Sequence, residues 1–184
     1  MLPLLGHGTV YHGTNLFAAT LIQRYGIWLN VQRNHTDFGR GFYVTLNKKQ
    51  AVQWAKVRAE IPPVNKKLLK LLKISEEFYK QHPFTKIPAL LMFKMDYNRL
   101  QQLNGFIFPL PHHPNWPFYK DVYTHFVYKC RHGNPHNYDF VYGPVGKPHQ
   151  TLWSTITFSK KKDQLSLNTL VSISMLKDMK IFIL

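Results

Sequence analysis

The sequence predicts an α+β fold in which short strands and amphipathic helices share one core. A length of 184 residues fits a single domain. Hydrophobic residues make up 45% of the chain and aromatic residues 15%, which is enough to bury a core. Segments rich in β-branched and aromatic residues also alternate with segments of helical spacing. We therefore expect residues 1–184 to form one domain.

The chain begins with a predicted strand followed by a helix. Residues 9–12 are β-branched and aromatic, and Asn15 follows them as a candidate helix N-cap. The apolar residues after Asn15 keep helical spacing, and Gly26 suits the left-handed position that commonly ends a helix. Residues 27–29 are expected to form a short extended piece.

A second strand and helix are predicted next. Residues 41–45 have strand character, and Asn47 is placed to cap the helix after them. Consecutive prolines at Pro62 and Pro63 end that helix. The apolar positions expected to share one face of the helix are Ala51, Trp54, Ala55 and Val57.

A basic helical insertion is expected near residues 60–88. Lys and Leu alternate at helical spacing over residues 66–73, which predicts an amphipathic basic segment. Such a segment is commonly a solvated helix face, and its charge density also suits anion binding. Pro83 and Pro88 bracket a predicted loop, and residues 89–95 are apolar enough for a buried strand.

The second half of the chain is less regular. Residues 105–119 are rich in proline and histidine and are expected to form an irregular loop. Aromatic residues dominate the segment that follows. Residues 137–145 predict another strand, which enters a Gly-Pro turn. Residues 165–184 have a strand-like start, a helix-like middle and a β-like end.

The charge balance is strongly one-sided. The chain has 24 Lys and Arg against 9 Asp and Glu, a net charge of +15. Such a surface attracts polyanions, and nucleic acid, an anionic membrane surface, an acidic protein and a pyrophosphate all qualify. The single cysteine excludes an internal disulfide framework. Residues 1–5 are too short for a signal peptide, and no apolar run reaches membrane-spanning length. These features predict a cytoplasmic protein, and they do not exclude delivery as a secreted effector.

Three short blocks carry the functional signal. Residues 11–14 read Tyr-His-Gly-Thr, residues 38–45 read Phe-Gly-Arg-Gly-Phe-Tyr-Val-Thr, and residues 163–167 read Asp-Gln-Leu-Ser-Leu. The first two resemble the His-Gly-Thr and Gly-x-Gly-aliphatic-Tyr blocks of diphtheria-type ADP-ribosyltransferases, which include the poly(ADP-ribose) polymerases. This resemblance implies two small, mostly antiparallel sheets packed around an NAD cleft, with helices on their flanks.

The match is closer to the DUF3990 family, a bacterial branch of that superfamily. Asp37 precedes the Phe-Gly pair, as it does in that branch. A strand over residues 138–145 and a final Gln-x-Ser-aliphatic block over residues 164–167 also resemble it. A helix signature completes the set with Gln50, Ala51, Trp54 and Ala55.

The resemblance implies a role for each site residue. His12 would bind the NAD ribose, and the Gly13 backbone would hold the nicotinamide carboxamide. Tyr43 would stack on the nicotinamide ring, and Gln164 would orient the ribose and the acceptor. The broader superfamily usually has Glu at this last position, and a Gln amide cannot act as a base. The remaining expected NAD-binding residues are Tyr11, Thr14, Arg40 and Gly41.

Structural explanations compete with each of these roles. His12 could be satisfied by backbone groups, and Tyr43 could fill the core. Gln164 could be a polar residue of an edge strand, Arg40 a solvated arginine, and Asp37 a loop cap. A zinc cluster of Cys130, His132 and His136 lacks recognised ligand spacing, so no metal is expected.

The function that this combination predicts is mono-ADP-ribosyl transfer. NAD would be the co-substrate, nicotinamide the leaving group, and a macromolecule the acceptor. The basic charge favours nucleic acid slightly over protein as that acceptor. By resemblance the protein would act as a toxin or effector, with an acidic neutralising partner. The alternatives are an inactive, basic nucleic-acid-binding protein with a degenerate transferase fold, and an NAD glycohydrolase.

Overall fold

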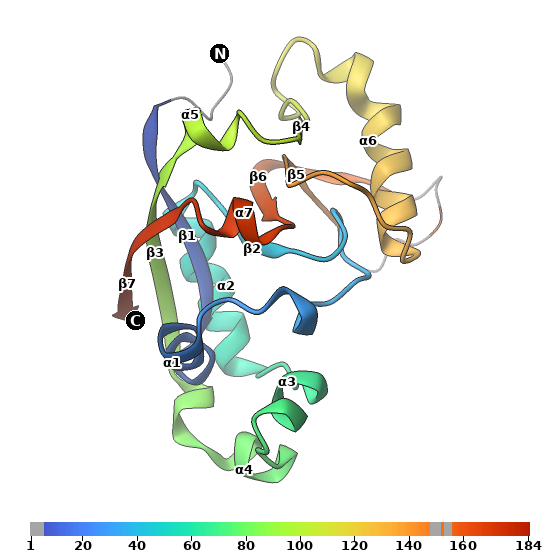
Figure 1. The fold of residues 1–184 in the computed structure, drawn as a ribbon. Coiled ribbons are helices and arrows are strands. Elements are labelled where there is room, and N and C mark those ends of the chain that lie inside the picture. The colour runs from blue at the N-terminus through green and yellow to red at the C-terminus, as the bar shows by residue number, and fades with distance from the viewer. Residues whose placement is uncertain (1–5, 148–151, 153–155) are drawn as a thin grey trace.

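A computed structural model describes residues 6–147, 152 and 156–184. The apolar residues 1–5 considered above lie outside this description. The described chain forms two small sheets side by side, with helices covering their outer faces (Figure 1). This arrangement confirms the α+β class and the pair of mostly antiparallel sheets with flanking helices.

The first sheet contains strands drawn from both ends and the middle of the sequence. Its order is β1 (His7–Asn15), β3 (Pro88–Asp96) and β7 (Leu176–Ile183), and both pairings are antiparallel. β3 is central, and β1 and β7 form the two edges.

The second sheet has four strands. Its order is β2 (Phe42–Val44), β6 (Phe158–Leu167), β5 (Phe140–Gly146) and β4 (Gly105–Ile107). The β2–β6 and β5–β6 pairs are antiparallel, and the β4–β5 pair is parallel.

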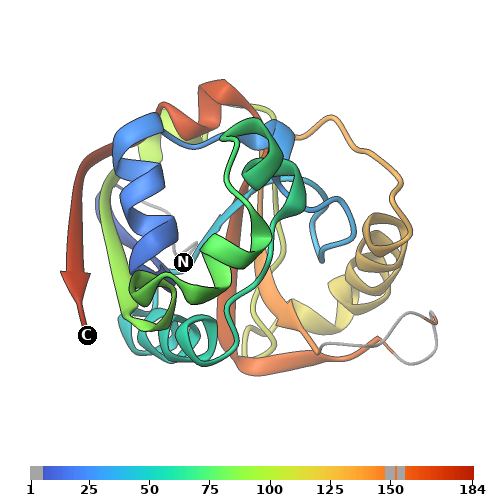
Figure 2. The same ribbon diagram turned by 90° about the horizontal axis from the view of Figure 1, so that it is seen from below.

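Helices lie on the outer side of each sheet. α2 packs on the first sheet and α6 on the second, while α1, α3 and α4 gather at one end of the molecule (Figures 1 and 2). The helix bounds are α1 Leu16–Tyr25, α2 Lys48–Glu60, α3 Lys66–Leu71, α4 Glu76–Gln81, α5 Tyr97–Leu100, α6 Trp116–Arg131 and α7 Leu170–Ile173. Short 3-10 helices form at η1 Leu29–Val31 and η2 Pro83–Lys86.

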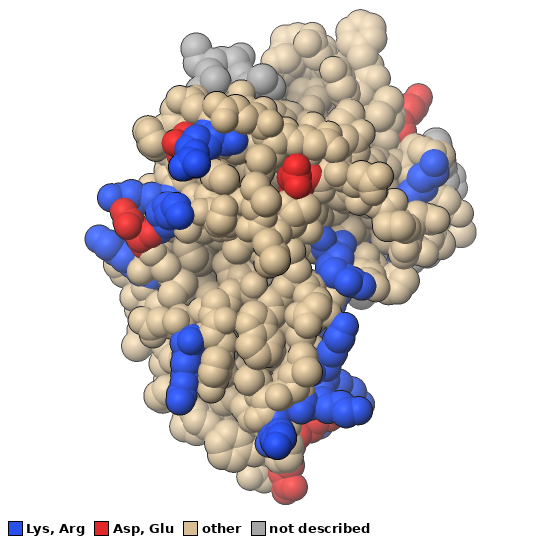
Figure 3. Space-filling view, in the orientation of Figure 1, with Lys and Arg blue, Asp and Glu red and all other residues tan. Residues whose placement is uncertain are grey.

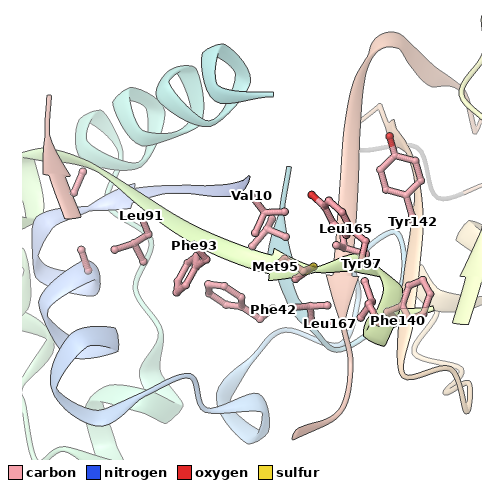
Figure 4. Packing of buried hydrophobic residues seen from close by; sticks show 14 of the residues in the cluster. Val10, Phe42, Leu91, Phe93, Met95, Tyr97, Phe140, Tyr142, Leu165 and Leu167 are labelled. Atoms are coloured by element: carbon pink, nitrogen blue, oxygen red, sulfur yellow. The ribbon is translucent and has the colours of Figure 1, made fainter. Parts of the chain in front are cut away.

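The main core fills the space between the two sheets (Figure 4). Successive side chains of a strand point to opposite faces, so alternate residues enter this core. Fully burying one such aromatic or aliphatic side chain contributes about 1.5–3 kcal/mol. The inner faces supply Val10, Leu91, Phe93 and Met95 from the first sheet and Phe42, Phe140, Tyr142, Leu165 and Leu167 from the second.

A second core lies between the outer face of the second sheet and α6. Its members are largely aromatic, which explains the aromatic run that the sequence carries here. They are Phe38, Phe108, Trp116, Tyr123, Val127, Val141 and Ile156.

Local capping signals are confirmed. The Asn15 side chain accepts a hydrogen bond from the Ala18 N–H at 2.9 Å, and Asn47 accepts one from the Gln50 N–H at 3.1 Å. Gly26 ends α1 with φ at 77°, a left-handed value that glycine adopts without strain.

Some local expectations need correction. The expected extended piece at residues 27–29 is found only in part: Trp28 has extended backbone angles, and Leu29 already begins the 3-10 helix η1. The expected irregular loop at 105–119 contains β4 and the start of α6, because Pro117 is tolerated in the first turn of a helix. The predicted apolar face of α2 is also wrong in part, since Trp54 is 39% and Val57 47% exposed. Its buried residues are Gln50, Ala51, Ala55 and Ala59.

The basic insertion folds as α3, α4 and η2. Leu69 of α3 and Tyr79 of α4 join Phe17 of α1 in a small third core, so the lysines of α3 are held on a packed helix. None of the helices in the described ranges is long and apolar enough to cross a membrane.

Candidate functional site

The two sheets meet where β1 and β2 pair and then separate. The Tyr11 N–H donates to the Thr45 carbonyl oxygen at 2.9 Å, and the Thr45 N–H donates to the Tyr11 carbonyl at 2.9 Å. One residue further along β1, the His12 ring takes the place of backbone pairing. Its Nδ1 lies 2.6 Å from the Tyr43 carbonyl oxygen, which can only accept, so Nδ1 carries the proton.

The separation of the strands leaves one edge of β1 open beside His12. In an antiparallel pair, alternate residues direct their N–H and C=O groups to the same neighbour. The backbone of Tyr11 faces β2, so that of Gly13, two residues on, faces the same side. β2 contributes no residue opposite Gly13 in the described pairing. The Gly13 edge therefore offers one donor and one acceptor.

His12 is held as a neutral imidazole. Its ring stacks on Phe42 with centroids 4.6 Å apart. Part of the side chain reaches solvent, but protein atoms surround the ring closely. Burial lowers the pKa of His12 to about 4, and the positive charge of Arg58 adds to this effect against the opposing hydrogen bond to Tyr43. With Nδ1 protonated, Nε2 is left with a lone pair, and no partner for it is found among the described residues.

Gly13 also has a packing role that is independent of any ligand. A Cβ added at this position would overlap the Ala51 carbonyl oxygen and lie 2.7 Å from the Ala55 nitrogen. Only glycine allows α2 to approach β1 this closely. Ala51 and Ala55 of the helix signature have small side chains, which also allow this close approach.

The remaining polar residue of that signature joins α2 to β6. Gln50 donates from Nε2 to the Asp163 carbonyl at 2.7 Å and accepts from the Asp163 N–H at 3.2 Å. The Asp163 carboxylate accepts from Thr45 Oγ1 at 2.7 Å and from the Leu46 N–H at 3.0 Å. Burial raises the pKa of Asp163, and these donors hold its carboxylate at the start of α2.

The Tyr43 side chain is directed into the protein. Phe42 faces the core between the sheets and Tyr43 packs on the α6 side, as strand alternation requires. The Tyr43 hydroxyl donates to the Gly39 carbonyl at 2.8 Å and accepts from the Phe38 N–H at 3.0 Å. It also lies 2.7 Å from Thr36 Oγ1. Burial raises the pKa of this hydroxyl. Its hydrogen bonds hold the turn at residues 36–39 in place.

Gln164 belongs to a buried network centred on Asp37. Its Nε2 donates to Asp37 Oδ2 at 2.7 Å and to the Pro144 carbonyl at 3.1 Å. Arg131 donates to Asp37 Oδ1 from Nε at 2.9 Å and from Nη2 at 2.6 Å, and the Gly146 N–H donates to Oδ2 at 2.7 Å. The ion pair is about nine-tenths buried on both sides. It joins the loop before β2, the end of α6, β5 and β6.

The structure thus separates the predicted site residues into two groups. The His12 ring and the Gly13 edge lie together, with the Tyr43 backbone beside them. The Tyr43 and Gln164 side chains lie on the α6 face of the second sheet. Their predicted contacts with nicotinamide and ribose remain predictions, and both side chains have partners within the fold.

The other predicted NAD-binding residues have varied surroundings. Tyr11 forms the strand bridge, and Thr14 is buried. Arg40 is exposed and donates from Nε to Asn34 Oδ1 at 2.6 Å. A Cβ at Gly41 would overlap Ser166 Oγ, so glycine is required there by packing against β6.

Sequence reasoning missed Arg131 and Arg58. Arg131 ends an aromatic helix and forms the central ion pair, and Arg58 lies close enough to influence His12. Both arginines are remote in sequence from the groups that they act on. Neither belongs to a motif, so only the tertiary structure identifies them.

Metal ligation finds no support in the described part of the chain, where no three His, Cys, Asp or Glu side chains cluster. Burial raises the pKa of Cys130 to about 12. His132 Nδ1 donates to the Tyr128 carbonyl at 2.7 Å and His136 Nε2 to the Phe38 carbonyl at 2.9 Å. The His132 bond lies at the end of α6, and the His136 bond joins the segment after α6 to the loop before β2.

One shallow pocket lies apart from the candidate site. Its volume is about 270 Å³, and both acidic and basic side chains line it. The lining residues are His7, Lys94, Met95, Asp96, Arg99, Met175, Lys177 and Asp178. None of them belongs to the functional blocks.

Comparison with known families identifies a match over most of the chain. The model of the family described as "Protein of unknown function (DUF3990)" matches residues 9–149. The matched range includes the first two blocks, the α2 signature and β5, and it ends before Gln164. No curated protein matches the chain.

Proposed function

Because the chain belongs to the DUF3990 family, whose function is unknown, we propose its activity from the site. We propose that it transfers ADP-ribose from NAD to a macromolecule and releases nicotinamide. The observation that carries this proposal is the open edge of β1. Gly13 offers one donor and one acceptor beside the neutral His12 ring. A carboxamide presents a complementary acceptor and donor.

His12 acts in this reaction by positioning. Its Nε2 lone pair accepts a hydrogen bond from a ribose hydroxyl, while Nδ1 stays bound to the Tyr43 carbonyl. A neutral imidazole does not oppose the positive charge that develops on the ribose, whereas a protonated ring would. The pKa of about 4 keeps the ring neutral at physiological pH.

The bond changes require little proton transfer. The C–N bond between ribose and nicotinamide breaks, and its electron pair leaves with nicotinamide. A nucleophilic atom of the acceptor then bonds to the same ribose carbon and releases its proton to solvent. Holding the ribose and the acceptor in a fixed geometry supplies most of the acceleration.

One observation favours a second candidate, a basic binding protein without catalysis. The amide of Gln164 donates to Asp37 and to a backbone carbonyl, so it is committed to the fold. No carboxylate stands at that position to assist an incoming nucleophile. NAD hydrolysis without a macromolecular acceptor is the third outcome that the experiment below separates.

The charge distribution bears on the acceptor. Lys and Arg side chains outnumber acidic side chains on the face in Figure 3, where they lie mainly toward its edges and some have an acidic side chain beside them. Counterion release would favour the binding of a polyanion to such a surface, and the affinity of this binding would fall as the salt concentration rises. We therefore favour nucleic acid as the acceptor over a neutral protein. An acidic neutralising protein would use the same charges.

The test measures nicotinamide release from labelled NAD with and without single-stranded DNA, RNA or cell protein. Nicotinamide release that depends on an added macromolecule, with transfer of the label to that macromolecule, supports the transferase. Release without any acceptor identifies a glycohydrolase. Salt-sensitive nucleic-acid binding without release identifies the non-catalytic alternative. His12→Ala should abolish release without unfolding the protein, and full activity in that variant would refute the proposed site.

A further inference from the structure

The edge of the first sheet at β7 is open. Among the described residues β7 pairs only with β3, and Figures 1 and 2 both place it at the outer side of the molecule, with no described element beyond it. β1 forms the opposite edge of this sheet, so β7 lies away from the candidate site at Gly13. An edge strand presents unpaired backbone N–H and C=O groups, which are a template for another strand.

Ladder geometry identifies the backbone groups that β7 directs outward. The Leu184 N–H donates to the Pro88 carbonyl at 3.0 Å, so the backbone of Leu184 faces β3. In an antiparallel pair, alternate residues face the same neighbour, and Phe182 therefore faces β3 as well. Ile181 and Ile183 direct their N–H and C=O groups to the open side. They offer two donors and two acceptors, and the pairing with β3 is regular over this part of the strand.

Apolar side chains flank these outward groups. Ile181 packs against the main core, and Ile183 is 65% exposed. Both side chains lie on the inner face of the first sheet, because they pair with β3 residues that belong to that core. Phe182 lies on the other face and is 41% exposed, and Lys48 Nζ of α2 is 6.0 Å from its ring centroid. A strand added at this edge would cover part of this apolar surface.

The β7 edge is also basic. Lys177 and Lys180 are exposed on the strand, and Lys94 lies opposite Lys177 on β3. Asp178 is the single acidic residue of β7, and its carboxylate is paired with Lys94 at 2.9 Å. The shallow pocket described above continues this surface at the start of β7, where Arg99 and Lys177 line it. The ion pairs of the described residues do not include Arg99, Lys177 or Lys180, so the edge favours an acidic segment.

The charges disfavour a second copy of this chain at the same edge. Antiparallel pairing of β7 with itself would bring the lysines of both copies into one interface, with only one aspartate from each strand to offset them. Lysines and bulges commonly protect an edge from such pairing, and β7 has a bulge at Asp178, whose φ is 50°. Residues 180–183 lie beyond the bulge in regular register. The edge therefore opposes a basic strand and admits an acidic one.

We propose that β7 binds an extended acidic segment of a partner protein as an additional antiparallel strand. The segment exchanges backbone hydrogen bonds with Ile181 and Ile183, and its residues directly opposite these two carry apolar side chains on the core side. The residues between them carry carboxylates on the face of Lys177 and Lys180. Main-chain hydrogen bonds supply the affinity in this mode of recognition, and the side-chain pattern supplies the specificity. The inference is independent of the proposed NAD chemistry, because it uses the other edge of the sheet.

Binding of a synthetic peptide to the full chain tests this assignment. The probe is a fluorescently labelled peptide of about ten residues in which valine and glutamate alternate, and fluorescence anisotropy measures its affinity. Two further peptides keep the same sequence and charge but are N-methylated at the central valines or at the central glutamates. N-methylation removes a backbone donor, as proline does. The valines lie opposite Ile181 and Ile183 in the proposed strand, so their N–H groups face β7 and those of the glutamates face solvent.

Two protein variants test the contribution of charge. Replacing Lys177 and Lys180 together by glutamine removes two positive charges from the β7 edge. The matched control replaces Lys160 and Lys162 by glutamine, which removes the same charge from exposed lysines of β6. Any difference between these variants therefore reports the location of the charge and not its total.

We expect N-methylation of the valines to weaken binding about tenfold or more and N-methylation of the glutamates to leave the affinity within about twofold. The Lys177→Gln, Lys180→Gln variant should lose about fivefold in affinity, and the β6 control should lose none. Any other response to N-methylation, or equal affinities in the two lysine variants, overturns the inference. A wild-type chain that binds no peptide, or one that self-associates through β7 and excludes the peptide, also overturns it.

Discussion

Replacing Gln164 by glutamate would introduce a carboxylate at the position where the resemblance to ADP-ribosyltransferases leads one to expect it. In this fold we expect the change to destabilise the protein. Gln164 Nε2 donates to Asp37 Oδ2 at 2.7 Å and to the Pro144 carbonyl at 3.1 Å. A glutamate carboxylate cannot donate a hydrogen bond, so it would face the Asp37 carboxylate and the Pro144 carbonyl without a proton between them. The position is only 9% exposed.

The magnitude follows from those contacts. A hydrogen bond to a charged group contributes about 1.5–3 kcal/mol, and repulsion between two buried carboxylates adds to its loss. We expect Gln164→Glu to lower the free energy of unfolding by about 3 kcal/mol or more at pH 8. The introduced carboxyl can recover part of this by taking up a proton and donating to Asp37. Its pKa in the folded state is then raised, so the deficit should shrink as the pH falls toward 5.

Urea denaturation at pH 5 and pH 8 measures these differences in the free energy of unfolding. The proteins compared are wild type, Gln164→Glu and Gln164→Met. The methionine variant removes the donor without adding charge, so its deficit should be smaller and independent of pH. Comparing each variant with wild type at the same pH cancels the titration of other groups. A glutamate variant as stable as wild type at pH 8, or one with the same pH response as the methionine variant, would refute the role assigned to Asp37.

Three further predictions concern stability. Arg131→Met should cost about 3–5 kcal/mol because it leaves the Asp37 carboxylate buried and unpaired, and a double variant that also removes the carboxylate should recover part of this loss in thermal unfolding. Gly13→Ala should cost about 3 kcal/mol by forcing α2 away from β1, visible as a lowered Tm, and a normal Tm would contradict the close packing against Ala51. His12 has a folded pKa of about 4 against an ordinary 6.5, so the unfolded state binds more protons below pH 6.5 and stability should fall as the pH drops from about 6.5 to 4. The loss amounts to about 3 kcal/mol, and His12→Gln should abolish this part of the pH dependence measured by denaturation.

Local structure was predictable where one residue type decides it. Asn15 and Asn47 cap their helices, and Gly26 takes a left-handed φ, because short side chains and glycine have specific backbone preferences. The α2 face was not predictable in the same way. Ala51 and Ala55 are buried while Trp54 stays exposed, because Gly13 admits only small residues and this close approach is a tertiary feature.

The candidate site was predictable only in part, for a similar reason. The order of motifs brings His12 and Gly13 to one edge, and strand alternation directs the Tyr43 ring to the opposite face. That alternation depends on the register of β2 against β6, which the motif does not encode. The ion pair between Asp37 and Arg131 joins segments that are distant in sequence, and no local sequence pattern predicts such a contact.

The strand order of the second sheet has a consequence for biosynthesis. β6, at Phe158–Leu167, lies between β2 and β5, and it is synthesised after both. Until the ribosome has added it, β2 lacks its ladder partner, and Phe42 and Phe140 lack the Leu165 and Leu167 side chains of their shared core. Such non-local strand pairing is slow and leaves hydrophobic surface and unpaired strand edges exposed in the meantime. We therefore expect nascent chains stalled before Phe158 to be degraded rapidly by added protease and to recruit chaperones, whereas chains stalled far enough beyond Leu167 to expose β6 should resist cleavage.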